Sequence, residues 1–335
     1  MARSLIFVDD SLPGISRRKH RGHWAYFGPD GARITDRAEI DRLNHIALPP
    51  AYTDAWFAPR GDAHILATGI DARGRKQYRY HPDFIAARET AKFDRCAEFG
   101  RLLPLIRARV EDDLSGLDLS RQRAIASIVR LLDSGRIRVG NEAYARDNGS
   151  YGATTLRMKH ARIARGRLRL RFKAKSGKPC EIGMTDRRLI RFVRQMQDLP
   201  GQHLFQYLQK DGEPTPVTSS DVNAYLHETT GTDVTAKHFR TWRASVLAFA
   251  WLTDGKAEAG LKPMLAFVSE HLGNTPAIAR KSYVHPALLE MATTGAPDFH
   301  GALPLPRRTR WLSRHERGLI AFLDEQAVSG SPGAR

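Results

Sequence analysis

The chain has 335 residues, of which 41% are hydrophobic, and its 53 Lys and Arg residues outnumber 36 Asp and Glu residues to give a net charge of +17. This excess favours a polyanionic partner, because clustered Lys and Arg side chains displace counterions from phosphates. The two cysteines exclude a disulfide framework and a Cys-rich zinc site. No apolar run approaches the ~20 residues of a membrane span, so we expect no membrane partner and a cytoplasmic, nucleoid-associated location.

Residues 1–87 are predicted to form a small β-rich domain. The segment 23–36, "HWAYFGPDGARITD", predicts a hairpin around a Pro-Asp-Gly turn. The following "DRAE" has the spacing of a capping box and predicts a short helix that ends near His45.

Two further strands are predicted in the segment 64–82, "HILATGIDARGRKQYRYHP", around a charged, Gly-containing loop. Tyr78 and Tyr80 share one face of the second strand, and Gln77 lies on the other. The two tyrosines either contact sugar or base on a phosphate-binding surface or pack into the core of a half-buried strand. Both interpretations remain open at this point.

Residues 88–300 are predicted to form a larger, mainly helical domain interrupted by one hairpin, which makes the whole chain α+β. Helices are expected over 118–135, with Gly135 as the C-terminal cap, and over 235–255. A polar loop over 210–221 leads into another helix. The predicted buried positions of the two long helices are Ile125, Ile128, Val129, Leu132, Phe239, Trp242, Val246 and Phe249.

The last segment, 301–335, is predicted to hold one helix and a disordered end. Ser313 and Glu316 have the spacing of a capping box before an apolar run. Disorder is expected over 327–335.

The predicted hairpin begins with "RLRLRFKAKSGK", in which cationic and apolar side chains alternate before a Ser-Gly turn. Like charges on one strand face repel each other unless an anion lies across them. The alternative is a solvated sheet edge that blocks aggregation. We favour DNA contact for the cations Arg167, Arg169, Arg171 and Lys173, with Lys175 at the turn.

Several motifs of metal and nucleotide chemistry are missing from the sequence. There is no G-x-x-x-x-G-K-[ST] loop, no H-E-x-x-H and no Cys pair at metal spacing. "VEDD" at 110–113 could hold magnesium, but its charged surroundings favour a solvated helix face. If the chain acts on DNA, we expect it to do so without a metal or another cofactor.

The stretch 274–286, "NTPAIARKSYVHP", places Tyr283 at the end of a short helix, after two cations. Thr275 suits the N-cap and Pro276 the first helical position. A buried tyrosine can simply anchor a helix through its ring and hydroxyl. A phenol is also a nucleophile, and nearby cations lower its pKa from about 10.

Cleaving a phosphodiester without metal requires fixed positive charge on the phosphoryl oxygens as well as a nucleophile. Arginine supplies permanent charge and bidentate geometry. Ile137 and Val139 are expected to point inward, so that Arg138 projects from a short strand. Arg240 is flanked by core positions of its helix, which should hold it rigidly.

The leaving alkoxide needs an acid, and the phosphate can use further hydrogen-bond donors. Lys175, at the tip of the basic hairpin, could reach a leaving oxygen. Asn274 precedes the helix of Tyr283 and can donate a neutral hydrogen bond to a phosphoryl oxygen.

In this order along the chain, these residues resemble the type IB DNA topoisomerases, and most closely their small, poxvirus-like bacterial form. The resemblance extends over about residues 20–290. It is carried by "ATGIDARGRKQYRYHP", "RIRVGNEAYARDNGSYGATTLRMKH", "FKAKSGK", "VTSSDVNAYLHETTGTDVTAKHFRTWRAS" and "LGNTPAIARKSYVHP". The segment after about residue 300 matches nothing that can be assigned.

The resemblance implies an active site and a set of DNA contacts. Several relatives have His where this chain has Asn274, and an amide cannot be a general acid. The implied catalytic positions are Arg138, Lys175, Arg240, Asn274 and Tyr283, with Lys237 as an auxiliary lysine, and the implied DNA contacts are Gln77, Tyr78, Tyr80 and Tyr144.

The family further implies a monomeric, two-lobed clamp on double-stranded DNA. The tyrosine would attack a backbone phosphate to give a 3′-phosphotyrosyl link, the free end would swivel, and religation would follow without ATP or metal. A tyrosine recombinase has a similar Arg-Lys-Arg-Tyr site, but usually shows His in place of Lys237 and of Asn274. A non-catalytic DNA-binding module is a third interpretation, which leaves the match at five functional positions unexplained.

Overall fold

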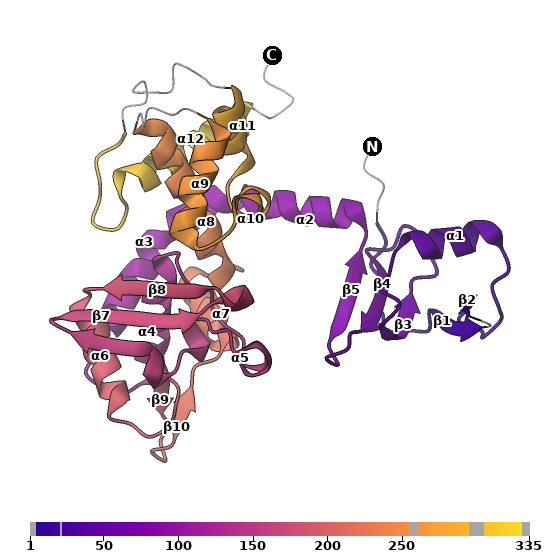
Figure 1. Cartoon of the computed structure of the whole chain (residues 1–335). Helices are drawn as coiled ribbons and strands as arrows, with labels where there is room; N and C mark the ends of the chain where they lie inside the picture. The colour runs from indigo at the N-terminus through magenta and orange to yellow at the C-terminus, as the bar shows by residue number, and fades with distance from the viewer. Residues whose placement is uncertain (1–4, 21, 255–259, 295–304, 330–335) are drawn as a thin grey trace. The chain divides into compact units, whose positions relative to one another are not determined.

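The computed structural model describes residues 5–20, 22–254, 260–294 and 305–329. The chain divides into two compact units, Met1–Lys92 and Phe93–Arg335. The first unit is built around a sheet and the second mainly from helices (Figure 1), which confirms the predicted α+β class. The division falls inside helix α2 (Pro82–Asp94), the helix that also contains the predicted boundary at 87/88.

The first unit contains a five-stranded antiparallel sheet in the order β2-β1-β3-β4-β5. One helix, α1 (Arg37–His45), follows the second strand. The strands are β1 (Ile15–His20), β2 (His23–Phe27), β3 (Thr53–Phe57), β4 (Ile65–Ile70) and β5 (Lys76–Tyr80).

The core of this unit lies between the sheet and α1. Tyr26 packs edge-on against Phe57, with 5.5 Å between the ring centres. The Tyr26 hydroxyl donates to Oδ1 of Asn44 at 2.9 Å, so the buried phenol is satisfied. The buried members of this core are Ile15, Tyr26, Leu43, Leu48, Phe57 and Ala67.

Local patterns in this unit are largely confirmed. The Pro-Asp-Gly turn forms, and Gly28 N donates to the Ala32 carbonyl at 2.8 Å. Its hairpin is smaller than predicted, because β2 pairs along its length with β1, and only Arg33 bridges to Phe27 after the turn. Asp36 caps α1 by accepting from Ala38 N.

The second unit contains most of the helices and one prominent sheet (Figure 1). The 3-10 turns are short and lie in the connections. Its helices are α3 (Cys96–Asp113), α4 (Arg121–Asp133), α5 (Glu142–Asn148), α6 (Arg187–Gln197), α7 (Ser219–Thr230), α8 (Ala236–Thr253), α9 (Leu261–Leu272), α10 (Pro276–Ser282), α11 (Pro286–Thr294) and α12 (Arg314–Ser329).

This unit contains more strands than the single hairpin that the sequence predicts. Strands β6 (Ala161–Ala164), β7 (Arg167–Lys173) and β8 (Pro179–Met184) form a three-stranded antiparallel sheet. A second pair is formed by β9 (Gln206–Leu208), which precedes the predicted polar loop, and β10 (Pro214–Pro216), which lies within it. Both strands of that pair have only three residues, too few to give a periodic pattern.

Helices α4 and α8 lie in the core of the second unit. Ser120 caps α4 by accepting from Arg123 N, so the helix begins at residue 121, later than predicted. Gly135 follows with φ +71°. All eight predicted core positions of α4 and α8 are buried.

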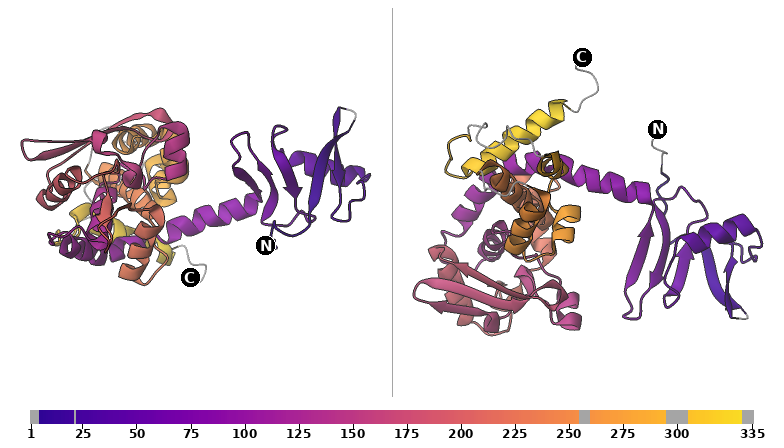
Figure 2. Two further views of the ribbon diagram at one scale, coloured as in Figure 1. Left: turned by 90° about the horizontal axis from the view of Figure 1, so that it is seen from below. Right: turned by 45° about the horizontal axis from the view of Figure 1, so that its top comes forward.

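Helix α12 packs against α3 and α8 and thus belongs to the second unit (Figure 2). The predicted capping box is present, with Ser313 N donating to Glu316 and Glu316 N donating to the Ser313 hydroxyl. The helix continues to Ser329, beyond the predicted start of disorder at 327, and residues 330–335 lie outside the described residues. Within the described ranges, no helix combines the length and apolar character needed to cross a membrane.

Candidate active site

Tyr283 follows directly on α10, the short helix that the Thr-Pro pair predicts. The Thr275 hydroxyl accepts from Ile278 N at 3.3 Å, and Pro276 occupies the first turn. Tyr283 N still donates to the Ala279 carbonyl at 3.1 Å, so the backbone of the tyrosine is held by the last turn. Its side chain is half-buried, and the phenol oxygen faces a guanidinium 3.5 Å away.

That guanidinium is Arg138, which lies in an irregular segment after α4 rather than in the predicted short strand. The segment is held by the stretch that begins at Gly152: Ala153 N donates to the Arg138 carbonyl at 2.8 Å. These two segments of the chain approach each other closely where Gly140 meets Gly152. A Cβ on Gly152 would lie 2.5 Å from Gly140 Cα, which explains glycine at both positions.

Arg240 lies on α8 and is only 4% exposed. Its Nη1 donates to the Gly135 carbonyl at 3.0 Å and its Nη2 to the Leu272 carbonyl at 2.9 Å. Its guanidinium carbon lies 5.1 Å from the centre of the Tyr283 ring. Two helix ends therefore anchor this arginine against the candidate nucleophile.

Asn274 joins the two arginines. Its Oδ1 accepts from Nη2 of Arg138 at 3.1 Å and from Nη2 of Arg240 at 2.9 Å. The amide reaches this position because Gly273 ends α9 in the left-handed conformation, at φ +64°. With Oδ1 occupied in this way, Nδ2 is left to bind a ligand, and it is buried without a hydrogen-bond partner in the described part of the chain.

The four side chains form a site of strong positive charge. No carboxylate within the described ranges makes an ion pair with Arg138 or Arg240. Burial and the charge of Arg138 lower the pKa of Arg240 to about 10. Because an unpaired buried charge is costly, such a site favours a bound anion.

The same charges act on the tyrosine. Burial by itself raises the pKa of the Tyr283 phenol, but the two guanidinium groups outweigh burial, and the pKa lies below its ordinary value. A purely anchoring phenol would be expected to donate to a carbonyl or carboxylate. This one faces cations, which is the environment of an activated nucleophile.

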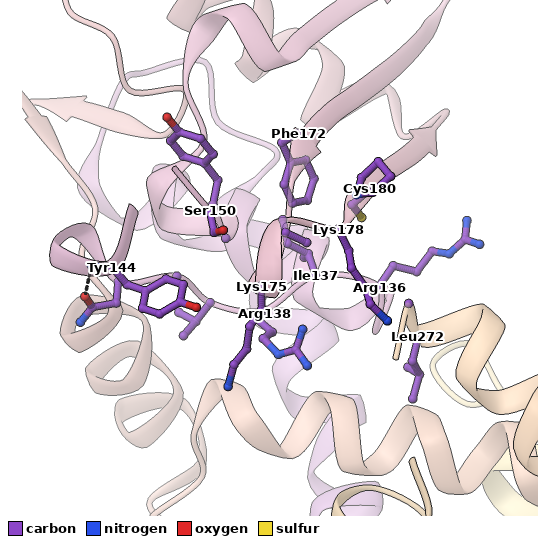
Figure 3. Close-up of a pocket in the computed structure, with 18 residues that line it drawn as sticks. Arg136, Ile137, Arg138, Tyr144, Ser150, Phe172, Lys175, Lys178, Cys180 and Leu272 are labelled. Carbon is purple, nitrogen blue, oxygen red and sulfur yellow. Dashed lines mark hydrogen bonds between the residues drawn. The ribbon is translucent and has the colours of Figure 1, made fainter. Parts of the chain in front are cut away.

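A pocket of about 480 Å³ adjoins Arg138 (Figure 3). Lys175, from the turn between β7 and β8, lines it together with Tyr144 of α5. Lys175 is exposed, so its amine is accessible to a substrate. The pocket also contains Arg136, Lys178 and Cys180, which sequence reasoning did not single out. Arg136 lies two residues before Arg138, and Lys178 lies three residues after Lys175. This closeness to predicted site residues is the signal that could have pointed to both cations.

The remaining predicted cations of this unit lie on α8 and β7. Lys237 is exposed in the first turn of α8, one helical turn before Arg240. Strand β7 alternates as predicted, with its apolar side chains buried and its cations exposed. Two of those cations, Arg169 and Arg171, pair with Glu181 of β8 at 3.3 and 2.7 Å. Arg167 and Lys173 are exposed at the two ends of the strand.

The predicted DNA contacts of the first unit lie on β5. The Tyr78 and Tyr80 rings stack with 5.7 Å between their centres. Tyr78 is 41% exposed, so its face of the strand is not a closed core. The Gln77 amide donates to the Asp71 carboxylate at 2.9 Å, which orders the preceding loop.

The acidic stretch 110–113 lies at the end of α3 as a helix, as predicted. Val110 is buried in the core. Asp113 accepts from the Tyr225 hydroxyl at 2.7 Å and pairs with Arg109. Across the described residues, no cluster of three or more His, Cys, Asp and Glu side chains is arranged to hold a metal ion.

Known families match most of this chain. The model of the catalytic core of eukaryotic DNA topoisomerase I matches residues 81–279, and that of the N-terminal domain of bacterial DNA topoisomerase IB matches residues 23–71. The chain therefore belongs to the type IB DNA topoisomerases. It is an isomerase of that family, with an N-terminal region of the bacterial kind.

Viral relatives agree with this assignment. The chain is 31% identical to the DNA topoisomerase 1B of Acanthamoeba polyphaga mimivirus over 294 residues, which are 84% of this chain and 88% of that protein. It is 24% identical to the DNA topoisomerase I of Monkeypox virus over 76% of this chain and 82% of that protein. Identity to the DNA topoisomerase 1B of vaccinia virus (strain Copenhagen) is 23% over the same shares.

Among solved structures, a XerH site-specific recombinase bound to palindromic difH substrate gives a TM-score of 0.32 at 17% identity. The overlap covers 55% of this chain and 49% of that chain, and so weak a likeness does not bear on function.

Proposed function

We propose that this chain relaxes supercoiled duplex DNA by transient cleavage of one strand, with Tyr283 as the nucleophile. The observation that carries the proposal is the phenol oxygen of Tyr283 at 3.5 Å from Arg138, beside a second, buried guanidinium. The phenol oxygen attacks a backbone phosphorus, the phenol loses its proton, and the bond to the 5′-oxygen breaks. A 3′-phosphotyrosyl link and a free 5′-hydroxyl result, and religation reverses both bond changes.

The two arginines act as stabilisers of charge in this proposal. Negative charge builds on the non-bridging oxygens as the phosphorus passes through the transition state, and fixed guanidinium groups stabilise it without reorganising. Arg138 and Arg240 already converge on Asn274 Oδ1. A phosphoryl oxygen can take hydrogen bonds from the same groups and from the unpaired Asn274 Nδ2.

Lysines supply the proton in this proposal. Lys175 is assigned as the acid for the departing 5′-oxygen, since it lines the pocket beside Arg138. Lys237 is assigned an auxiliary role, which rests on the family resemblance alone. The phosphoryl bond energy is retained in the tyrosyl link, so the reaction requires neither ATP nor metal.

We also propose how the chain binds DNA. A monomer is expected to hold the duplex, with the stacked pair Tyr78 and Tyr80, together with Gln77, contacting DNA from the first unit. In the second unit the exposed cations of β7 and Tyr144 are assigned to DNA. Family membership and the net charge of +17 support this arrangement, and nucleoid association follows from it.

The first experiment is incubation with supercoiled plasmid in EDTA without ATP. We expect full relaxation through intermediates that differ by single linking numbers, because one strand is cut at a time. Tight binding to the plasmid without relaxation would contradict the proposal. Exchange of strands between two sites, without relaxation, would indicate a recombinase instead.

Asn274 provides a graded test of the site. Asn274→His keeps a donor near the phosphate, so cleavage is expected to fall by less than about tenfold, roughly 1.4 kcal/mol. Asn274→Ala removes both the free Nδ2 and the acceptor that orients two arginines, and should lose on the order of 10²-fold. Single-turnover cleavage of a duplex oligonucleotide measures both variants. Wild-type cleavage by Asn274→Ala would remove Asn274 from the site.

A further inference from the structure

The C-terminal helix α12 inserts a charged side chain into the second unit. Glu316 is only 7% exposed. Its carboxylate accepts from Arg107 of α3, with 2.7 Å between Oε1 and Nη2 and 3.2 Å between Oε2 and Nη1. Arg107 also makes a bidentate pair with Asp133, with both N–O distances at 2.9 Å. We call Arg107, Asp133 and Glu316 the tail network.

The tail network is held ionised. Burial opposes the charge on Glu316, but hydrogen bonds and the charge of Arg107 outweigh it and lower the pKa of Glu316 to about 2. The backbone N–H of Ser313 and the indole N–H of Trp242 donate to the same carboxylate at 2.8 and 3.3 Å. These partners all donate hydrogen bonds to the carboxylate. If the carboxylate lost its negative charge, the donors would have a weaker acceptor in its place.

Asp133 of the tail network and Trp242, which donates to Glu316, both lead directly to the candidate active site. Asp133 is the last residue of α4, and the chain continues from it to Gly135, whose carbonyl accepts from Arg240 at 3.0 Å. Three residues beyond Gly135 lies Arg138. Trp242 is on α8, two residues after Arg240, and is 2% exposed. Gly100 of α3 packs against this indole so tightly that a Cβ there would lie 2.3 Å from the ring.

We infer that Glu316 is a positioning residue for the cleavage reaction. Through Arg107 it fixes the C-terminal end of α4, and through Trp242 it fixes α8, so that Arg138 and Arg240 are held in register with Tyr283. Glu316 does not touch the reacting atoms. The match to the family's catalytic core ends at residue 279, so this support comes from a part of the chain outside that match. The inference rests on the proposed function.

The test is Glu316→Gln, which keeps the shape of the side chain and removes its charge. Single-turnover cleavage of a duplex oligonucleotide, measured well below the melting temperature of the variant, is expected to slow about 10- to 100-fold, as when a transition-state contact is displaced. Affinity for the same duplex should change by less than about threefold, because phosphate contacts dominate binding.

A matched control separates positioning from stability. Phe322→Leu alters a buried residue of the same helix, one that packs against Phe249 of α8 with 5.9 Å between ring centres. It leaves the tail network intact. It should lower the melting temperature and leave the cleavage rate near that of the wild type. If Glu316→Gln also melts earlier but cleaves at the wild-type rate, Glu316 is merely structural and the inference is wrong.

A double-variant cycle tests the route through Arg240. If Glu316 acts by placing Arg240, then Glu316→Gln should slow cleavage much less in an Arg240→Ala background than in the wild type. If Glu316→Gln slows cleavage by the same factor in both backgrounds, Glu316 does not act by placing Arg240. Should Glu316→Gln fail to fold, Arg107→Lys keeps the charge, loses the bidentate geometry, and is expected to slow cleavage in the same range. Failure of the wild type to relax plasmid would instead contradict the proposed function.

Discussion

Tyr283→Phe is expected to abolish both plasmid relaxation and covalent attachment to DNA while leaving duplex affinity nearly unchanged. The substitution removes one oxygen from a half-buried ring. That oxygen is the only protein atom that the proposed reaction bonds to phosphorus, and no other residue of the described site has a hydroxyl in the same place. Affinity should persist because it depends on many phosphate contacts.

The measurement is trapping of the covalent complex by denaturation after mixing with labelled duplex DNA. The wild type should give a protein–DNA adduct that resists detergent, and Tyr283→Phe should give none. Thermal melting of the variant serves as the control, because the ring still packs against the Arg240 guanidinium, 5.1 Å from its centre in the wild type. An adduct formed by Tyr283→Phe would show that another residue is the nucleophile.

Lys175→Ala is expected to slow cleavage of ordinary DNA by about 10²–10⁴-fold, the contribution of a positioned general acid. An alkoxide is a poor leaving group, so a proton delivered in the transition state matters. Lys175 is exposed at the β7–β8 turn, and its removal should not disturb the core. Binding of the duplex should remain close to that of the wild type.

Replacing the 5′-bridging oxygen by sulfur provides the decisive comparison, since a thiolate leaves without an acid. On that substrate Lys175→Ala should recover to nearly the wild-type rate. Arg240→Ala should not recover, because its role is to stabilise charge on the phosphoryl oxygens. If sulfur rescues neither variant, Lys175 positions the phosphate, and Lys237 or Arg138 becomes the next candidate for the acid.

Much of the local structure could be predicted because its causes lie within a few residues. The alternation of β7 follows from the period of a strand, and all three of its apolar side chains are buried. The start of α10 follows from Thr275 and Pro276. The capping box of α12 is likewise a three-residue pattern. Where the causes are not local, prediction fails: Arg138 lies outside any strand, β10 lies within the predicted polar loop, and β9 is not predicted at all.

The sequence by itself determined the α+β class, the basic character of the protein, the core faces of α4 and α8, and the family. Composition can be counted directly from the sequence, and periodicity and long motifs involve residues that lie close together in the chain. Only the tertiary structure decided how the site is assembled. Asn274 Oδ1 is shared by two arginines, one of them 136 positions away in the chain. Arg107 meets Glu316 across 209 positions. Such contacts depend on how helices pack, and packing is set by many weak interactions that no short stretch of sequence contains.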